Sequence, residues 1–367
     1  MRAARDIRAS VPTSIERLVA HAAREVQMLA ALTPLQAYRE RQRLVGAIQS
    51  GKPALPRWTY APVAHADLRS ALAAAERVLA RGGEPLQLLY LGRVRELSLE
   101  AALCAAAGTH DVAELARERF AAGDPDIVRG ALELCDAWLV EPSVPTAGSH
   151  LVSDDPHPRS LLSQMRQAVS KLRLPFEVVA RRSLAPLAAT GERVILVAAG
   201  RLVHEEDAVR TVLHEVEGHA RPRARSQDSP MALMQIGTAR GVDDQEGRAL
   251  LLEERAGMLG HRRRRQLAAR HRAVQAMLAG ASFADVASML IEAPGLDPVD
   301  AVVVAERAFR GSDGTRPGLG RERLYLESFV RVRAHLGARP EDEAWMSAGQ
   351  VASDAVKTLR QCSRRLH

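Results

Sequence analysis

The chain has 367 residues, of which 47% are hydrophobic, 26% charged and 3% aromatic, and its net charge is +7. This length suits two subdomains or one large enzyme domain, and the scarcity of aromatic residues favours helices built on Leu, Val and Ala. The densest basic run, HRRRR at residues 261–265, has no interleaved aromatic residues. We therefore expect a solvated helix face there, and no nucleic-acid partner.

The cysteines and the apolar runs argue against further classes of protein. Cys104, Cys135 and Cys362 form no C-x-x-C pair, so neither a cysteine metal site nor a disulfide framework is indicated. Cys104 and Cys135 lie among apolar residues and fit small core positions. No run of about 18 apolar residues occurs, and the N-terminus has no apolar signal segment, so we expect a cytoplasmic protein without membrane contact. The oligomeric state cannot be predicted.

The predicted elements of the first part of the chain are helices. Apolar residues at helical spacing and glycine stops predict helices from residue 13 to about 30 and over 67–81, 90–108, 111–121 and 125–139. Residues 140–159 are rich in Pro, Ser, Gly and Asp, and they predict a linker or a long connecting loop.

The second part combines strands with helices. A helix is predicted over 160–172, and β-branched residues predict strands over 176–180 and 192–198. A helix follows with an apolar stripe that includes Val209, Val212 and Val216. The rest of the chain is mostly helical, so the fold class we expect is mainly α (α+β).

That helix carries the sequence HEVEGH, residues 214–219. Histidines four residues apart lie about 40° apart around a helix and can share a zinc ion, whereas residues five apart lie about 140° apart. His214 and His219 are five apart, so they can share an ion only if the helix is overfilled by one residue, as in a π-bulge. Gly218 is a residue that accommodates such a distortion.

A catalytic zinc ion needs a third protein ligand and one open position. The segment GVDDQEGRALLLEERAG, residues 241–257, offers one, because Glu246 lies one turn into a helix that Asp243 and Asp244 would begin. Glu253, two turns after Glu246 on the same face, is placed to orient a histidine ligand.

These residues support a comparison with a known family. TVLHEVEGHA, residues 211–220, followed by QIGTARGVDDQEGRA, residues 235–249, resembles the zinc metallopeptidase family of the microtubule-associated tyrosine carboxypeptidases. Its bacterial members are called flavohemoglobin expression-modulating QEGLA-motif proteins. The QEGLA signature stands here as QEGRA, with Arg248 in place of leucine. Further similar blocks at 89–109, 192–200 and 308–330 extend the resemblance over most of the chain.

The resemblance implies a fold, a cofactor and an activity. By it, His214, His219 and Glu246 bind one Zn²⁺ per chain, and Glu215 is the general base. The implied fold is zincin-like, with a small β-sheet against the active-site helices, a helical N-terminal subdomain at 1–145 and a catalytic domain at 146–367. The implied substrate is a peptide or protein C-terminus, with tyrosine or phenylalanine as the residue released.

Other side chains are candidates for substrate contacts. Tyr325 is our candidate donor to the oxyanion, and Arg310 and Arg321 are our candidates for the terminal carboxylate, which a guanidinium binds through two hydrogen bonds. We expect the strand at 192–198 to be the edge strand that pairs with the substrate backbone. All three residues and the strand lie in the blocks that resemble the family.

Two alternatives stay open. The lengthened H-E-x-x-x-H also occurs in dipeptidyl peptidase III, which has a different downstream signature, so cleavage of the dipeptidyl-peptidase type or as an endopeptidase is a second reading. A non-catalytic regulatory protein that keeps zinc structurally is a third. Glu215 argues against it, because a structural site needs no base and usually has four protein ligands.

Overall fold

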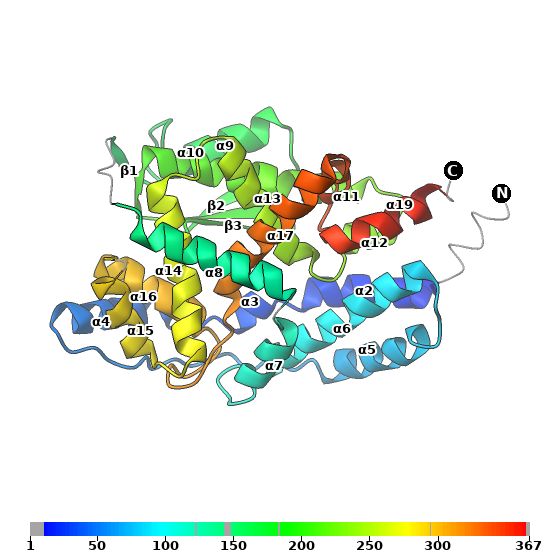
Figure 1. The fold of residues 1–367 in the computed structure, drawn as a ribbon, viewed down its shortest axis with the longest axis horizontal. Coiled ribbons are helices and arrows are strands. Elements are labelled where there is room, and N and C mark those ends of the chain that lie inside the picture. Colours follow the sequence, from blue (N-terminus) through cyan, green and yellow to red (C-terminus); the bar gives the residue numbers. More distant parts are fainter. Residues whose placement is uncertain (1–10, 122, 143–147, 183, 294, 365–367) are drawn as a thin grey trace.

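Helices form the N-terminal part of the chain, as the apolar spacing predicts (Figure 1). The structure, a computed structural model, describes residues 11–121, 123–142, 148–182, 184–293 and 295–364. The first helix ends at Glu25 and does not reach residue 30, because Val26 leaves helical geometry with ψ of 88°. The helices of this part are α2 (Thr13–Glu25), α3 (Met28–Ala31), α4 (Ala37–Gln49), α5 (Ala66–Leu79), α6 (Pro85–Ala105), α7 (Val112–Arg119) and α8 (Pro125–Val140).

A small sheet lies in the middle of the chain. Strand β4 (Val194–Ala198) is its centre, with β2 (Glu177–Arg181) parallel on one side and β3 (Ala188–Thr190) antiparallel on the other. A separate antiparallel pair joins β1 (His150–Val152) to β5 (Leu202–His204). The strands predicted at 176–180 and 192–198 are confirmed as β2 and β4, and the three-residue strands were not predicted.

The sheet packs against the helices that carry the HEVEGH sequence. Its inward side chains Val178, Ile195 and Val197 share one core with residues of α9 (Leu161–Lys171), α10 (Glu205–Leu213) and the π-helix η1 (His214–Ala220). The chain then continues through α11 (Arg221–Gln227), α12 (Ala232–Ile236) and α13 (Gly241–Arg255). The expected mainly α fold with a small sheet is thus confirmed.

The last third of the chain is helical again. Its elements are α14 (His261–Leu278), α15 (Phe283–Glu292), α16 (Pro298–Ala308), η2 (Arg321–Arg323), α17 (Leu324–Ala338), η3 (Pro340–Asp342), α18 (Glu343–Met346), η4 (Ser353–Ala355) and α19 (Val356–Arg364). In Figure 1, α14 and α17 run through the middle of the molecule beside α8. In the described part of the chain, no helix combines enough length and apolar character to cross a lipid bilayer.

Residues from the N-terminal and C-terminal parts of the chain pack together in one hydrophobic core. The largest apolar core combines residues from α2, α6 and α8 with residues from α13, α17 and α19. Cys104 and Cys135 lie in it as small buried residues, as predicted. A buried ion pair also joins α4 to α16, with Arg41 Nε 2.8 Å from Glu306 Oε2 and Arg41 Nη2 2.9 Å from Glu306 Oε1. The boundary predicted between residues 145 and 146 lies outside the described residues and stays a prediction.

Candidate metal centre

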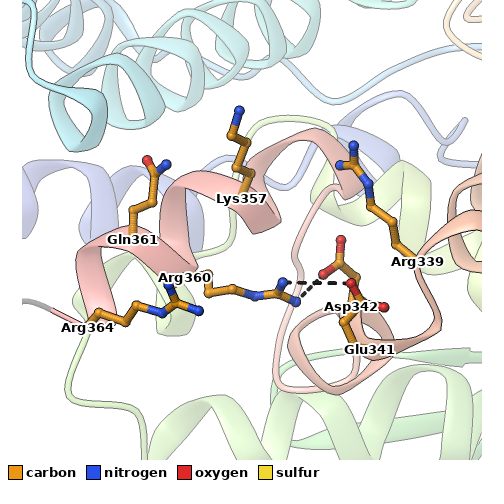
Figure 2. A pocket seen from close by; sticks show the side chains of 7 residues that line it. All are labelled: Arg339, Glu341, Asp342, Lys357, Arg360, Gln361 and Arg364. Atoms are coloured by element: carbon orange, nitrogen blue, oxygen red, sulfur yellow. Dashed lines mark hydrogen bonds and ion pairs between the residues drawn. The ribbon is translucent and has the colours of Figure 1, made fainter.

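A surface pocket of about 320 Å³ lies away from the predicted site residues. Elements η3 and α19 form it, and both of its carboxylates face one arginine, since Arg360 binds Asp342 and lies 3.9 Å from Glu341 (Figure 2). The side chains lining it are Arg339, Glu341, Asp342, Lys357, Arg360, Gln361 and Arg364. This set contains no cysteine or histidine, and none of the predicted site residues belongs to it.

The helix that carries HEVEGH is widened as predicted. Helix α10 runs into the π-helix η1, which spans His214–Ala220, and α11 follows without a break. The amide of Arg221 donates to the carbonyl of Val216, five residues back, which is the π-helical register. The extra residue brings His214 and His219 onto one side, with their ring centroids 5.0 Å apart. The π-bulge prediction is confirmed.

Gly218 serves this geometry by its small size. Its backbone angle φ is not positive, so the position does not need the conformational freedom of glycine. A Cβ atom placed on Gly218 would lie 2.7 Å from the Cβ of Ala249 on α13. The glycine therefore lets α13 approach the π-helix closely, and this approach places Glu246 beside the histidines.

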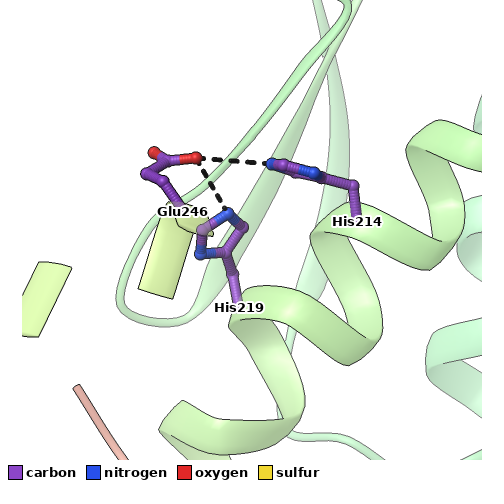
Figure 3. A group of neighbouring side chains, drawn as sticks. All are labelled: His214, His219 and Glu246. Carbon is purple, nitrogen blue, oxygen red and sulfur yellow. Dashed lines mark ion pairs between the residues drawn. The ribbon is translucent and has the colours of Figure 1, made fainter. Parts of the chain in front are cut away.

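Three side chains meet at this junction. His214 and His219 from η1 and Glu246 from α13 offer ligand atoms that all lie within 4.8 Å of one another (Figure 3). Glu246 Oε2 lies 3.4 Å from His214 Nε2 and 3.6 Å from His219 Nε2. Tetrahedral ligands about 2.0–2.1 Å from a zinc ion lie roughly 3.3 Å from each other. The spacing of these atoms fits such an ion.

The remaining ring nitrogens are held by neighbours on α13. His214 Nδ1 lies 2.7 Å from Glu253 Oε1, and His219 Nδ1 lies 3.0 Å from Gln245 Oε1. Because both partners offer oxygen acceptors, each Nδ1 donates a proton to its partner, and each Nε2 is left facing Glu246 as the atom that could bind a metal ion. The structure places Glu253 where the sequence suggested, whereas Gln245 was not predicted.

Glu253 is the centre of a buried charge network. Its carboxylate is fully buried and accepts two hydrogen bonds from Arg263, at 2.9 and 3.0 Å, while Arg210 lies 3.5 Å away. Burial alone would raise the pKa of Glu253, but Arg263 and His214 outweigh burial and hold this pKa well below its usual range. The prediction that residues 261–265 form a solvated face is therefore wrong for Arg263, which α14 turns inward.

The cluster favours positive charge at its centre. Burial alone would lower the pKa of His214, but its hydrogen bonds to Glu246 and Glu253 outweigh burial and raise this pKa to about 9. Burial likewise opposes ionisation of Glu246, yet the neighbouring His219 and His214 hold the pKa of Glu246 well below its usual range.

Two predicted substrate-binding residues contact Oε1 of Glu246, the carboxylate oxygen that does not face the histidines. Arg321 Nη2 is 3.1 Å from Glu246 Oε1, and the Tyr325 hydroxyl is 3.4 Å from the same atom. Arg307, which was not predicted, donates to the Tyr325 hydroxyl over 3.3 Å. Arg321 thus has a carboxylate partner inside the protein. In the described part of the chain Arg310 has no salt bridge, and burial, followed by the charge of Arg307, lowers the pKa of Arg310.

Glu215 faces the sheet's outer strand. Its side chain is buried, and Glu215 Oε2 accepts a hydrogen bond of 2.7 Å from the Thr190 hydroxyl on β3. The expectation that the strand at 192–198 is an edge strand is wrong, because β4 lies between β2 and β3. The edge beside Glu215 belongs to β3, whose three residues were too short to be recognised in the sequence.

The fold and the cluster define a class: a mainly helical protein whose widened helix and facing helix could hold a metal ion between two histidines and a glutamate. The family model of the microtubule-associated tyrosine carboxypeptidases matches residues 48–365. The chain therefore belongs to the microtubule-associated tyrosine carboxypeptidase family. Membership implies a carboxypeptidase activity on peptides or proteins. No curated protein matches the chain.

Proposed function

We propose that the chain is a zinc-dependent carboxypeptidase in which His214, His219 and Glu246 bind one zinc ion. The observation that carries the proposal is the arrangement of their ligand atoms, whose two measured separations of 3.4 and 3.6 Å suit a tetrahedral ion. The fixed Nδ1 protons of both histidines support it, because they direct both Nε2 atoms at one point.

Within the described residues the cluster contains three ligand side chains. Structural zinc sites usually have four protein ligands, and catalytic sites keep one position open. A bound zinc ion would act there as a Lewis acid and make water nucleophilic near neutral pH. The ligand count therefore favours the catalytic reading over a regulatory protein with structural zinc.

Glu215 is the proposed general base. It directly follows His214, it is buried, and Thr190 holds one of its carboxylate oxygens. In this role Glu215 takes a proton from the attacking water and later gives it to the leaving amine. The Thr190 hydroxyl restricts the rotation of the carboxylate and leaves its second oxygen for the water.

The substrate contacts follow from the remaining side chains. We assign the oxyanion contact to Tyr325 and the terminal carboxylate to Arg310, which has no salt bridge in the described chain. Arg321, our other candidate for the terminal carboxylate, already donates to Glu246 at 3.1 Å. The edge of β3 replaces β4 as the strand that pairs with the peptide backbone. Tyrosine or phenylalanine at the substrate's end is part of the proposal.

The test compares wild type with Glu215→Gln and a matched control, Glu217→Gln. Glu217 lies in the same π-helix but pairs with Arg221 at the surface, 2.8 Å away. We expect one zinc ion per chain in all three proteins by elemental mass spectrometry. Wild type and Glu217→Gln should release single C-terminal residues from a randomised peptide library, and Glu215→Gln should do so at least about 100-fold more slowly.

Other results would select another function. Internal cuts would show an endopeptidase, and removal of residue pairs would show an activity of the dipeptidyl-peptidase type. Zinc binding without any cleavage would favour the regulatory reading. Absence of zinc from the wild-type protein would refute the proposed metal centre.

A further inference from the structure

Arg248 differs from the other arginines near the candidate centre. It lies on α13 at the position where the QEGLA signature has leucine, and only 3% of it is exposed. In the described part of the chain it has no salt bridge, and burial lowers its pKa to about 10. Its Nη2 instead donates to two backbone carbonyls of the π-helix, Glu217 O at 2.8 Å and Gly218 O at 3.0 Å.

One of these carbonyls, Glu217 O, lacks a backbone donor for a reason that the sequence contains. The amide of Arg221 is already bonded to Val216 O, five residues back. In the same register the donor for Glu217 O would be residue 222, which is a proline and has no N–H. In the ordinary four-residue register, Pro222 would also be the donor for Gly218 O. The Arg248 guanidinium thus donates hydrogen bonds where the change of register and Pro222 leave the backbone without an N–H donor.

The two carbonyls directly precede His219. Without the Arg248 guanidinium, Glu217 O would be left unpaired in a buried segment, which proteins avoid. The segment could then relax towards the four-residue register, which turns His219 about 100° away from His214 around the helix. Leucine at position 248 has no hydrogen to donate, so in this chain it could not replace the arginine.

We infer that Arg248 is a positioning residue that holds the π-helical register and thereby aims His219 at the metal. This inference rests on the proposed function, because it assumes that His219 is a ligand. This role explains why the Arg248 guanidinium is buried without a carboxylate partner, since such a charge is otherwise costly in a protein interior.

The test is a double-mutant cycle between positions 248 and 222, with zinc affinity measured by chelator competition. Arg248→Met keeps the length of the side chain and removes every donor, so we expect zinc to bind about 10–100-fold more weakly, as for other residues that orient ligands. Pro222→Ala returns a backbone N–H to the helix. In that background most of the loss caused by Arg248→Met should disappear. Arg248→Lys, with one short donor group, should fall between wild type and Arg248→Met.

The outcomes separate this inference from the proposed function. If wild type and Arg248→Met bind zinc with equal affinity, the role of Arg248 is overturned and the proposed metal centre is not. The role of Arg248 is also overturned if Arg248→Met weakens zinc binding equally with Pro222 in place and in the Pro222→Ala background. The arginine would then act only by filling space. Wild type that binds no zinc would refute the proposed metal centre and this inference with it. Thermal unfolding of each variant without metal shows that the proteins compared are folded.

Discussion

The substitution Glu253→Gln tests the charge network behind His214 without reference to any metal. Glutamine has nearly the same shape and can still accept a hydrogen from His214 Nδ1, so the change removes mainly the negative charge. Arg263, which donates to Glu253 at 2.9 and 3.0 Å, and Arg210, at 3.5 Å, would then lose their shared carboxylate. Removing one partner of a buried ion pair destabilises a protein by about 3–5 kcal/mol.

The matched control is Glu254→Gln, one residue further along α13. Glu254 also pairs with an arginine, Arg333 at 3.2 Å, but its side chain is 37% exposed whereas Glu253 is fully buried. An exposed pair of this kind contributes no more than about 1 kcal/mol. Equilibrium urea denaturation of the metal-free proteins measures both free energies of unfolding. If the two variants lose the same free energy, the reasoning about burial is refuted.

Two further predictions concern packing and pH. Gly218→Ala places a methyl group 2.7 Å from the Cβ of Ala249 and should lower the free energy of unfolding by about 1–3 kcal/mol. The control Gly337→Ala, in α17 with no atom within 4 Å of the new methyl group, should leave this free energy unchanged or raise it. Equal decreases in the melting temperatures of the two variants would contradict this reasoning. His271 is buried, and burial lowers its pKa to about 4. As the pH falls, this histidine therefore takes up a proton in the unfolded protein before it does so in the folded protein, and the free energy of unfolding decreases between about pH 6.5 and 4. In urea denaturation across this range, wild type should lose about 3 kcal/mol more than His271→Leu, and parallel curves would count against this.

Local sequence patterns were enough to predict most helices and the centre of the site. The five-residue spacing of His214 and His219 required a widened helix, and the seven-residue spacing of Glu246 and Glu253 placed both on one face of α13. Strands β2 and β4 were predicted because each is five residues long and contains β-branched side chains. These features depend on neighbours in the chain, so the sequence alone contains them.

The features that were missed depend on packing between distant segments. Strand β3 has three residues, too few to show a period, so the edge beside Glu215 could not be assigned. Gln245 lies about 100° around the helix from Glu246, and only the close approach of α13 to the π-helix places it on His219. The arginine run at 261–265 gave no sign that one member, Arg263, would be buried against a carboxylate ten residues before it.

The ion pair between Arg41 and Glu306 has a practical consequence for anyone who wants to shorten this protein. A fragment that starts at residue 146 would keep the three side chains of the candidate centre but leave Glu306 buried without its guanidinium. It would also expose the faces of α13 and α17 that the N-terminal helices cover. We expect such a fragment to aggregate when expressed alone, and to become soluble when residues 1–145 are supplied as a separate chain in the same cell.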